Sequence, residues 1–219
     1  TWESPFNYQQ HSLLYLPAGM PEPSDSSYNA PLIEKVRPVI EASAGRAFLL
    51  FTSYRAMHAA EKLLKDTIDY PIQMQGEHPK HQLLERFREA GNAVLLGTSS
   101  FWEGVDVRGE ALSCVIIDKL PFASPGDPVM QARIDAIKHS GGQPFMDYQL
   151  PRAVIALKQG VGRLIRDVND RGVVVIGDPR ISSKTYGRIF LNSLPAMPVT
   201  ARLEDIEEFF ARRVAEAVA

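Results

Sequence analysis

The chain has 219 residues, enough for one large domain or two small ones and long enough to bury a substantial core. Its composition, 45% hydrophobic and 23% charged with a net charge of −2, is that of an ordinary globular protein and argues against a dedicated nucleic-acid-binding domain, which is usually more basic. No apolar run approaches the roughly 18 residues of a membrane span. The N-terminus lacks the pattern of a signal peptide and has no initiator Met, so we expect a cytoplasmic protein and a fragment or processed chain.

Short apolar runs alternate with segments of helical periodicity along the chain. The first run, 13–16, is expected to be an edge strand, and the proline-rich stretch 17–31 a loop or linker. Pro38 predicts a kink or break in its helix, and Ser53 is a candidate N-cap. Further strands are predicted at 46–51, 70–74, 93–96, 112–117 and 172–176, and helices at 32–42, 53–68, 80–89, 128–138, 151–158 and 184–194. This alternation favours an α/β fold with a parallel sheet and helices on both faces.

Residues 200–219 differ in character from the rest of the chain. They form an amphipathic helical pattern with acidic residues in the first half and arginines in the second, which suits the helix dipole. The helix either docks on its own domain or offers its apolar side to a partner, and Phe209 widens that side. The apolar stripe consists of Leu203, Ile206, Phe210 and Val214.

Cysteine and histidine usage gives no indication of a metal site. The single cysteine, Cys114, lies in an apolar run and is expected to be buried and inert. The five histidines show no recognisable ligand spacing.

The segment 159–166, Gln-Gly-Val-Gly-Arg-Leu-Ile-Arg, is the most informative part of the sequence. On a helix, Arg163 and Arg166 would share a face and could point at one target. Guanidinium groups suit phosphate oxygens, and glycines allow close backbone approach. The alternative is an ordinary surface helix with solvated arginines.

A second polar segment, 98–106, follows the apolar run 93–97. Small hydroxyl residues at the carboxyl end of such a strand lie where open α/β sheets bind ligands, and Glu103 and Asp106 would face the same crevice. Alternatively, these carboxylates cap a turn and Trp102 packs in the core.

Together the two segments resemble motifs V and VI of superfamily 2 nucleic-acid helicases, and more closely the XPD/DinG family and its YoaA-like branch. The resemblance runs from about residue 4 to residue 195. It implies that residues 1–199 form a RecA-like domain, the second of two motor domains, followed by the C-terminal helix 200–219. The matching text is Ser-Pro-Phe-Asn-Tyr at 4–8, Leu-Leu-Phe-Thr-Ser-Tyr at 49–54, Phe-Trp-Glu-Gly-Val-Asp at 101–106, Ile-Ile-Asp-Lys-Leu-Pro-Phe at 116–122, the segment 159–166, and Asp-Pro-Arg at 178–180.

The resemblance implies ATP hydrolysis by the longer parent protein, with ATP in a cleft between the two domains. The sequence contains no Gly-x-x-x-x-Gly-Lys-[Ser/Thr] phosphate loop, so this domain alone should be inactive. By resemblance, that loop and the residues that hold Mg²⁺ belong to the first domain. Arg163 and Arg166 would stabilise the charge on the transferred phosphoryl group, and Gln159 would bind phosphates or the attacking water. Asp106, supported by Glu103, would contact the ribose or couple the nucleotide to the DNA strand. The other nucleotide-binding residues it implies are Glu103, Gly104 and Gly162.

The resemblance also implies 5′ to 3′ translocation along single-stranded DNA in repair or replication. Hydroxyl and cationic side chains would contact the phosphate backbone, and Trp102, Phe122 or Tyr54 could stack on bases, with core packing as the alternative for each aromatic. The predicted DNA-binding residues are Ser53, Tyr54, Thr98, Ser99, Ser100, Trp102, Lys119 and Arg180.

Two other interpretations stay open. The domain could be a non-catalytic interaction module that docks a replication partner through 200–219; YoaA-like proteins are associated with a clamp-loader accessory subunit of the polymerase. A nucleotide-binding metabolic enzyme is a third interpretation, against which the missing Gly-x-Gly-x-x-Gly turn counts. Many members of the family carry an iron–sulfur cluster, which four cysteines of the first domain would hold.

Overall fold

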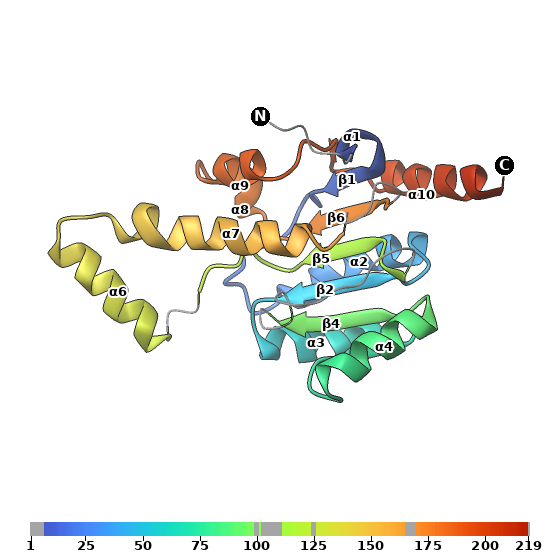
Figure 1. Cartoon of the computed structure of the whole chain (residues 1–219), viewed down its shortest axis with the longest axis horizontal. Coiled ribbons are helices and arrows are strands. Elements are labelled where there is room, and N and C mark those ends of the chain that lie inside the picture. The colour runs from blue at the N-terminus through green and yellow to red at the C-terminus, as the bar shows by residue number, and fades with distance from the viewer. Residues whose placement is uncertain (1–6, 99–100, 102–110, 124–125, 165–169, 219) are drawn as a thin grey trace.

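The computed structural model describes residues 7–98, 101, 111–123, 126–164 and 170–218, with side chains described as far as Arg212. Within these residues the strands form one seven-stranded sheet, in the order β3-β4-β2-β5-β6-β1-β7, and every neighbouring pair is parallel (Figure 1). The strands are β1 (Ser12–Tyr15), β2 (Ala47–Phe51), β3 (Ile72–Met74), β4 (Val94–Thr98), β5 (Cys114–Ile117), β6 (Gly172–Ile176) and β7 (Val199–Thr200).

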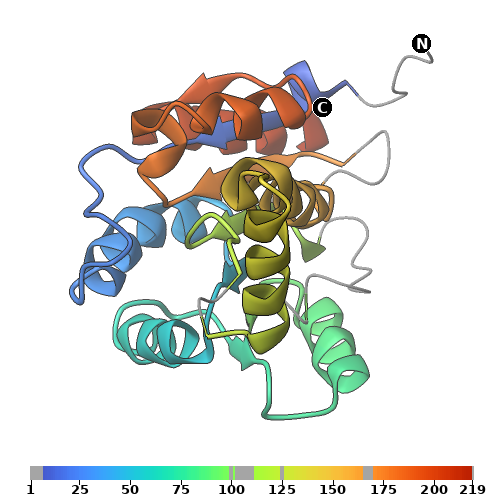
Figure 2. The same ribbon diagram turned by 90° about the vertical axis from the view of Figure 1, so that its left-hand side faces the viewer.

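Helices cover both faces of this sheet. In Figure 2 the blue and cyan helices α2 and α3 lie on one side of the sheet, and the green and orange helices α4 and α7 lie on the other. Helix α6 stands apart from the sheet, beyond the carboxyl ends of the strands (Figure 1). The helices are α1 (Tyr8–His11), α2 (Asn29–Ala42), α3 (Tyr54–Lys65), α4 (Lys80–Ala90), α6 (Pro128–His139), the π-helix η2 (Phe145–Gln149), α7 (Leu150–Val161), α8 (Arg180–Ser183), α9 (Gly187–Ser193) and α10 (Leu203–Val218).

The two faces of the sheet carry separate apolar cores because side chains alternate along each strand. On β2, Phe48 and Leu50 pack with α4, α7 and α9, while Leu49 and Phe51 pack with α2, α3 and α10. Full burial of each such side chain stabilises the fold by about 1.5–3 kcal/mol. The unbroken apolar runs of β2, β4, β5 and β6 therefore identify strands buried on both sides, as the sequence predicts.

Local signals in the sequence place several helix boundaries correctly. Ser53 caps α3, and its hydroxyl oxygen accepts a hydrogen bond from the Ala56 amide at 3.2 Å. Asp127 caps α6 in the same way, with Pro128 in the first turn. The buried thiol of Cys114 has a pKa raised by desolvation, which agrees with an inert cysteine.

Three local predictions are wrong. Strand β1 is not at the edge, because the two-residue strand β7 pairs with it on one side while β6 pairs on the other. Helix α2 continues through Pro38 to Ala42, so the proline does not break it; Val36, Val39 and Ile40 anchor that stretch in the core. Helix α7 ends at Val161, so Arg163 lies in the following turn and the helical-face argument for the two arginines does not apply.

Helix α10 packs on its own domain through its first half. Ile206 and Phe210 are buried in the core shared with α2 and β1, and Leu203 and Phe209 are half-buried beside it. This packing uses the apolar stripe that the sequence leaves open to two interpretations. None of the helices in the described part of the chain is long and apolar enough to cross a membrane.

Candidate functional site

Polar residues gather at the carboxyl edge of the sheet. Because all strands are parallel, the residues that follow β2, β3, β4, β5 and β6 meet at this edge. The structure therefore brings together the five described members of the predicted DNA-binding set, although they are far apart in the sequence. These are Ser53, Tyr54, Thr98, Lys119 and Arg180.

Tyr54 and Thr98 are joined by a residue outside that predicted set, Gln75. The Gln75 carbonyl oxygen accepts hydrogen bonds from the Thr98 amide at 2.7 Å and the Thr98 hydroxyl at 2.9 Å. Its amide nitrogen donates to the Tyr54 hydroxyl at 2.7 Å. Gln75 directly follows the predicted strand 70–74, so a polar residue at a strand's carboxyl end is the signal that could have found it.

The predicted hydroxyl contacts differ in exposure. Tyr54 is 53% exposed, and Ser53 is exposed beside it at the start of α3. Thr98 is only 5% exposed and directs its hydroxyl toward Gln75. In this structure Thr98 thus holds two loops together, while Tyr54 and Ser53 face solvent.

Lys119 and Arg180 make internal contacts at the same edge. The Lys119 ammonium donates to the Pro23 carbonyl at 2.6 Å and lies 4.3 Å from the centre of the Tyr28 ring. The Arg180 guanidinium forms a 2.6 Å ion pair with the buried carboxylate of Asp178 and lies over the Phe122 ring. Both cations therefore tie loops to the sheet in this structure instead of extending toward solvent.

Two buried aspartates organise the ends of β5 and β6. Asp118 accepts hydrogen bonds from the backbone amides of Thr52 at 3.0 Å and Lys119 at 2.6 Å. Asp178 accepts from the amides of Leu120 and Arg180 at 2.8 and 2.9 Å. Each carboxylate thereby fixes two loops, which explains why acidic residues follow these strands.

Burial changes the ionisation of Asp118. Desolvation raises the pKa of this carboxyl to about 7, and it outweighs the hydrogen bonds from Lys119 and Thr52, which lower the pKa. The nearby Tyr28 hydroxyl donates to the Asp118 carbonyl at 2.6 Å, and burial raises its pKa as well. The carboxyl edge is therefore a tightly packed polar network.

The three described members of the predicted nucleotide-binding set, Gln159, Gly162 and Arg163, lie at the opposite edge. Helix α7 ends beside the amino ends of β5 and β6, where Leu164 and the Ser113 carbonyl would contact any Cβ added at Gly172. Gln159 is exposed on the last turn of α7, Gly162 caps that helix, and Arg163 follows half-buried in the turn. This position at a helix end differs from the strand ends and loop-to-helix junctions expected for the motifs.

Seven predicted site residues lie outside the described part of the chain. They are Ser99, Ser100, Trp102, Glu103, Gly104, Asp106 and Arg166.

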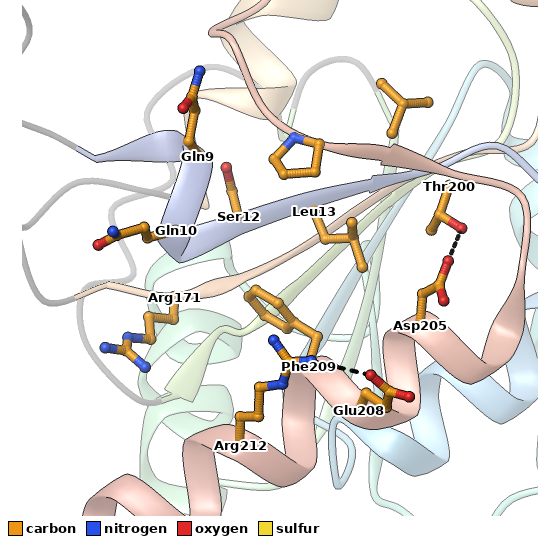
Figure 3. A pocket seen from close by; sticks show the side chains of 12 residues that line it. Gln9, Gln10, Ser12, Leu13, Arg171, Thr200, Asp205, Glu208, Phe209 and Arg212 are labelled. Atoms are coloured by element: carbon orange, nitrogen blue, oxygen red, sulfur yellow. Dashed lines mark hydrogen bonds and ion pairs between the residues drawn. The ribbon is translucent and has the colours of Figure 1, made fainter.

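None of the predicted site residues lines the cavity of about 700 Å³ that Figure 3 shows. It is bordered by α1, β1, β7 and α10, and its charged side chains include pairs of opposite sign, such as Arg212 and Glu208 at 3.1 Å. The motifs, and not this cavity, therefore locate the candidate site. Among the residues that the structure describes, no cluster of three or more His, Cys, Asp or Glu side chains could hold a metal ion.

Comparison with known proteins decides the family. A family model described as "Helicase C-terminal domain" matches residues 36–197. The chain belongs to this helicase family. Its XPD/DinG resemblance is confirmed by relatives with names from the same branch.

The ATP-dependent DNA helicase YoaA of Escherichia coli is 50% identical over 208 residues, covering 95% of this chain and 33% of that protein. The ATP-dependent helicase DinG of Mycobacterium tuberculosis is 38% identical over 215 residues, covering 98% of this chain and 32% of that protein. The chain thus spans about a third of the length of these relatives.

The fold is shared with a solved structure. The apo structure of XPD superposes with a TM-score of 0.64 at 20% identity, covering 88% of this chain and 40% of the other. This likeness confirms the RecA-like parallel sheet with helices on both faces.

Proposed function

We propose that this chain is the second motor domain of an ATP-dependent translocase or helicase that acts on single-stranded DNA in repair or replication. Membership of the helicase C-terminal domain family is the observation that carries the proposal. The arrangement of the domain supports it, because residues predicted to contact phosphate groups lie at both edges of one sheet. One edge would face the nucleotide and the other the DNA strand.

The nucleotide side of the proposal rests on the end of α7. The exposed Gln159 amide can donate to phosphate oxygens or orient a water, and the Arg163 guanidinium offers several donors to a charged phosphoryl group. Arg166 would act with Arg163. Such an arginine contributes about 10³–10⁵ in rate when it reaches a phosphoryl group across an interface.

The remaining catalytic parts would come from elsewhere in the parent protein. The sequence has no phosphate loop, so the first motor domain would bind most of the ATP and its Mg²⁺. When bound, Mg²⁺ would neutralise negative charge that develops on the phosphate groups. Nucleotide contacts from Glu103, Gly104, Asp106 and Gly162 belong to the same proposal. Any iron–sulfur cluster of the parent would also lie in another domain, since this chain has one buried cysteine.

The DNA side of the proposal rests on the carboxyl edge. Ser53 and Tyr54 are exposed at the start of α3, where the helix dipole favours phosphate groups. Contacts from Ser99, Ser100 and Trp102 would extend this surface. Phosphate contacts carry no base sequence information, which suits a protein that moves along a strand. Movement from 5′ to 3′ is carried over from the family.

Turnover of ATP by the parent protein tests this proposal. We expect stimulation by single-stranded DNA, and we expect Arg163→Ala to abolish it without unfolding the protein. The matched control is Arg37→Ala, because Arg37 is an exposed arginine on α2 that forms an ion pair with Glu41 on the same helix. Undiminished turnover in Arg163→Ala would refute the arginine's role.

A second candidate function is a protein-interaction module that docks a polymerase clamp-loader accessory subunit. The cavity beside the half-buried Phe209 favours it, since a partner side chain could enter there. Ile206 and Phe210 already pack on the domain, so the partner would have to bind the outer side of α10 or release the helix. Deletion of 200–219 separates the cases: loss of folding points to a structural helix, and loss of a partner alone to a docking element.

A further inference from the structure

The side chain of Gln75 connects two loops of the carboxyl edge. Gln75 follows β3, the short outer strand, and its backbone amide is held by the Leu96 carbonyl at 2.9 Å. Its side chain then reaches Thr98 at the end of β4 and Tyr54 after β2. One amide thus links the exposed Tyr54 to the loop that begins after Thr98.

The hydrogen bonds fix which end of the amide faces which neighbour. The Thr98 backbone N–H can only donate, so the end of Gln75 that lies 2.7 Å from it must be the carbonyl oxygen. The other end is therefore the NH₂ group, and it donates to the Tyr54 hydroxyl oxygen at 2.7 Å. The Tyr54 hydroxyl accepts this bond, which leaves its own proton directed elsewhere.

Because Tyr54 is exposed, its hydroxyl proton can be donated to a ligand. Tyr54 is 53% exposed at the first position of α3, next to the exposed Ser53. A hydroxyl that accepts one hydrogen bond from the protein is a better donor to an anion, because hydrogen bonds in a chain polarise one another. The group best suited to receive it on a single strand is a phosphate oxygen.

We infer that Gln75 is a positioning residue that sets the Tyr54 hydroxyl as a hydrogen-bond donor to a backbone phosphate of single-stranded DNA. This inference rests on the proposed function. Gln75 does not itself touch the strand; it holds the phenol in place and determines the direction of its hydrogen bond. Through Thr98 the same amide also holds the carboxyl end of β4.

Replacing Gln75 by Glu tests the direction of that bond. The carboxylate can still accept from both Thr98 groups, but it must accept from Tyr54 too, so the phenol proton turns inward. In the full parent protein we expect Gln75→Glu to weaken binding of a labelled oligo-dT strand. Tyr54→Phe should weaken it by about two- to ten-fold, the equivalent of one hydrogen bond.

A double-variant cycle separates positioning from added charge. Gln82→Glu adds the same charge at an exposed position on α4 and serves as the matched control. If the bond direction matters, Gln75→Glu costs less affinity in the Tyr54→Phe background than in the wild type. Equal costs in the two backgrounds would overturn the inference, since charge alone would then explain them.

Other outcomes of these measurements also test the inference. If Tyr54→Phe binds the strand as tightly as wild type, the inference is overturned even where Gln75→Glu does not fold. A lower melting temperature with unchanged DNA affinity would assign Gln75 a structural role only and overturn the inference. Wild-type protein that neither binds single strands nor is stimulated by them would overturn the proposed function itself, which distinguishes the two failures.

Discussion

The two edges of the sheet differ in how completely they are built. At the carboxyl edge, buried Asp118 and Asp178 each bind two backbone amides, and Lys119 and Arg180 close onto the same network. At the amino edge, α7 ends with an exposed Gln159 and a half-buried Arg163. At the first edge, the described polar groups bond to one another, whereas at the second edge the proposed nucleotide site would be completed by another domain. This difference fits the proposed motor, which would bind a DNA strand at one edge and share its nucleotide at the other.

The largest expected effect is at the amino edge. Arg163→Ala in the parent should lower DNA-stimulated ATP turnover by about 10³-fold or more, because the developing phosphoryl charge loses its counter-charge. Affinity for single-stranded DNA without nucleotide should stay unchanged, since Arg163 lies at the edge opposite Tyr54. Steady-state turnover and fluorescence anisotropy measure the two quantities. A matching loss of DNA affinity would show that the two edges are not independent.

Among substitutions at the carboxyl edge, removal of a buried carboxylate should lower the free energy of unfolding most. Asp178→Ala leaves the Leu120 amide without its acceptor and the Arg180 guanidinium without its ion-pair partner. We expect the free energy of unfolding to fall by about 3–5 kcal/mol, as when one partner of a buried pair is removed. Urea denaturation of the domain measures it. The exposed pair Arg37–Glu41 is the comparison, and Glu41→Ala should cost less than about 1 kcal/mol.

Stability should also depend on pH through Asp118. Its pKa in the folded protein is about 7, above the ordinary value of 3.8, so the folded state holds the proton more tightly. The stabilisation of the folded state by protonated Asp118 is complete below about pH 4. It is lost as the pH rises to about 7, at roughly 1.4 kcal/mol per pH unit at most.

The Asn variant isolates this contribution. Asp118→Asn cannot titrate, and its amide can donate to the Thr52 hydroxyl that now donates to the carboxylate. The difference in unfolding free energy between wild type and variant should therefore shrink or reverse between pH 4 and pH 7, and level off above. A difference that is constant with pH would contradict the raised pKa.

The smallest expected effect is on the cap of α3. Ser53→Ala removes the acceptor for the Ala56 amide and should cost about 1 kcal/mol of stability. Ser53→Gly should lower the stability by only a few tenths of about 1 kcal/mol, so this variant serves as the control. Thermal unfolding of both variants checks the ranking, and an equal loss in the two would deny the capping role.

Much of the fold could be predicted because its signals are local. The apolar runs of β2, β4, β5 and β6 identify buried strands, and Ser53 marks the start of α3 through its own turn. The position of β1 could not be predicted in this way. Strand β7 has two residues, too few for a recognisable pattern, yet it covers the outer side of β1.

The sequence names candidate site residues, but it does not show how they lie in the fold. Motif spacing identifies Gln159 and Arg163 as candidates, but Gly160 and Gly162 have low helix propensity, and α7 ends between these two glycines, before Arg163. Lys119 and Arg180 were expected to contact a DNA strand. In the structure, the Lys119 ammonium bonds to the Pro23 carbonyl and the Arg180 guanidinium pairs with Asp178.

The sequence by itself determined the helicase family, the α/β alternation and the residue types able to bind phosphate. These depend on motif order and on periodicities that act within a single strand or turn. Only the tertiary structure decided that Gln75 links Tyr54 to Thr98 and that the two groups of candidate residues lie at opposite edges. Such contacts join residues separated by 21 and 23 positions, and they form only once the strand order β3-β4-β2 brings the loops together.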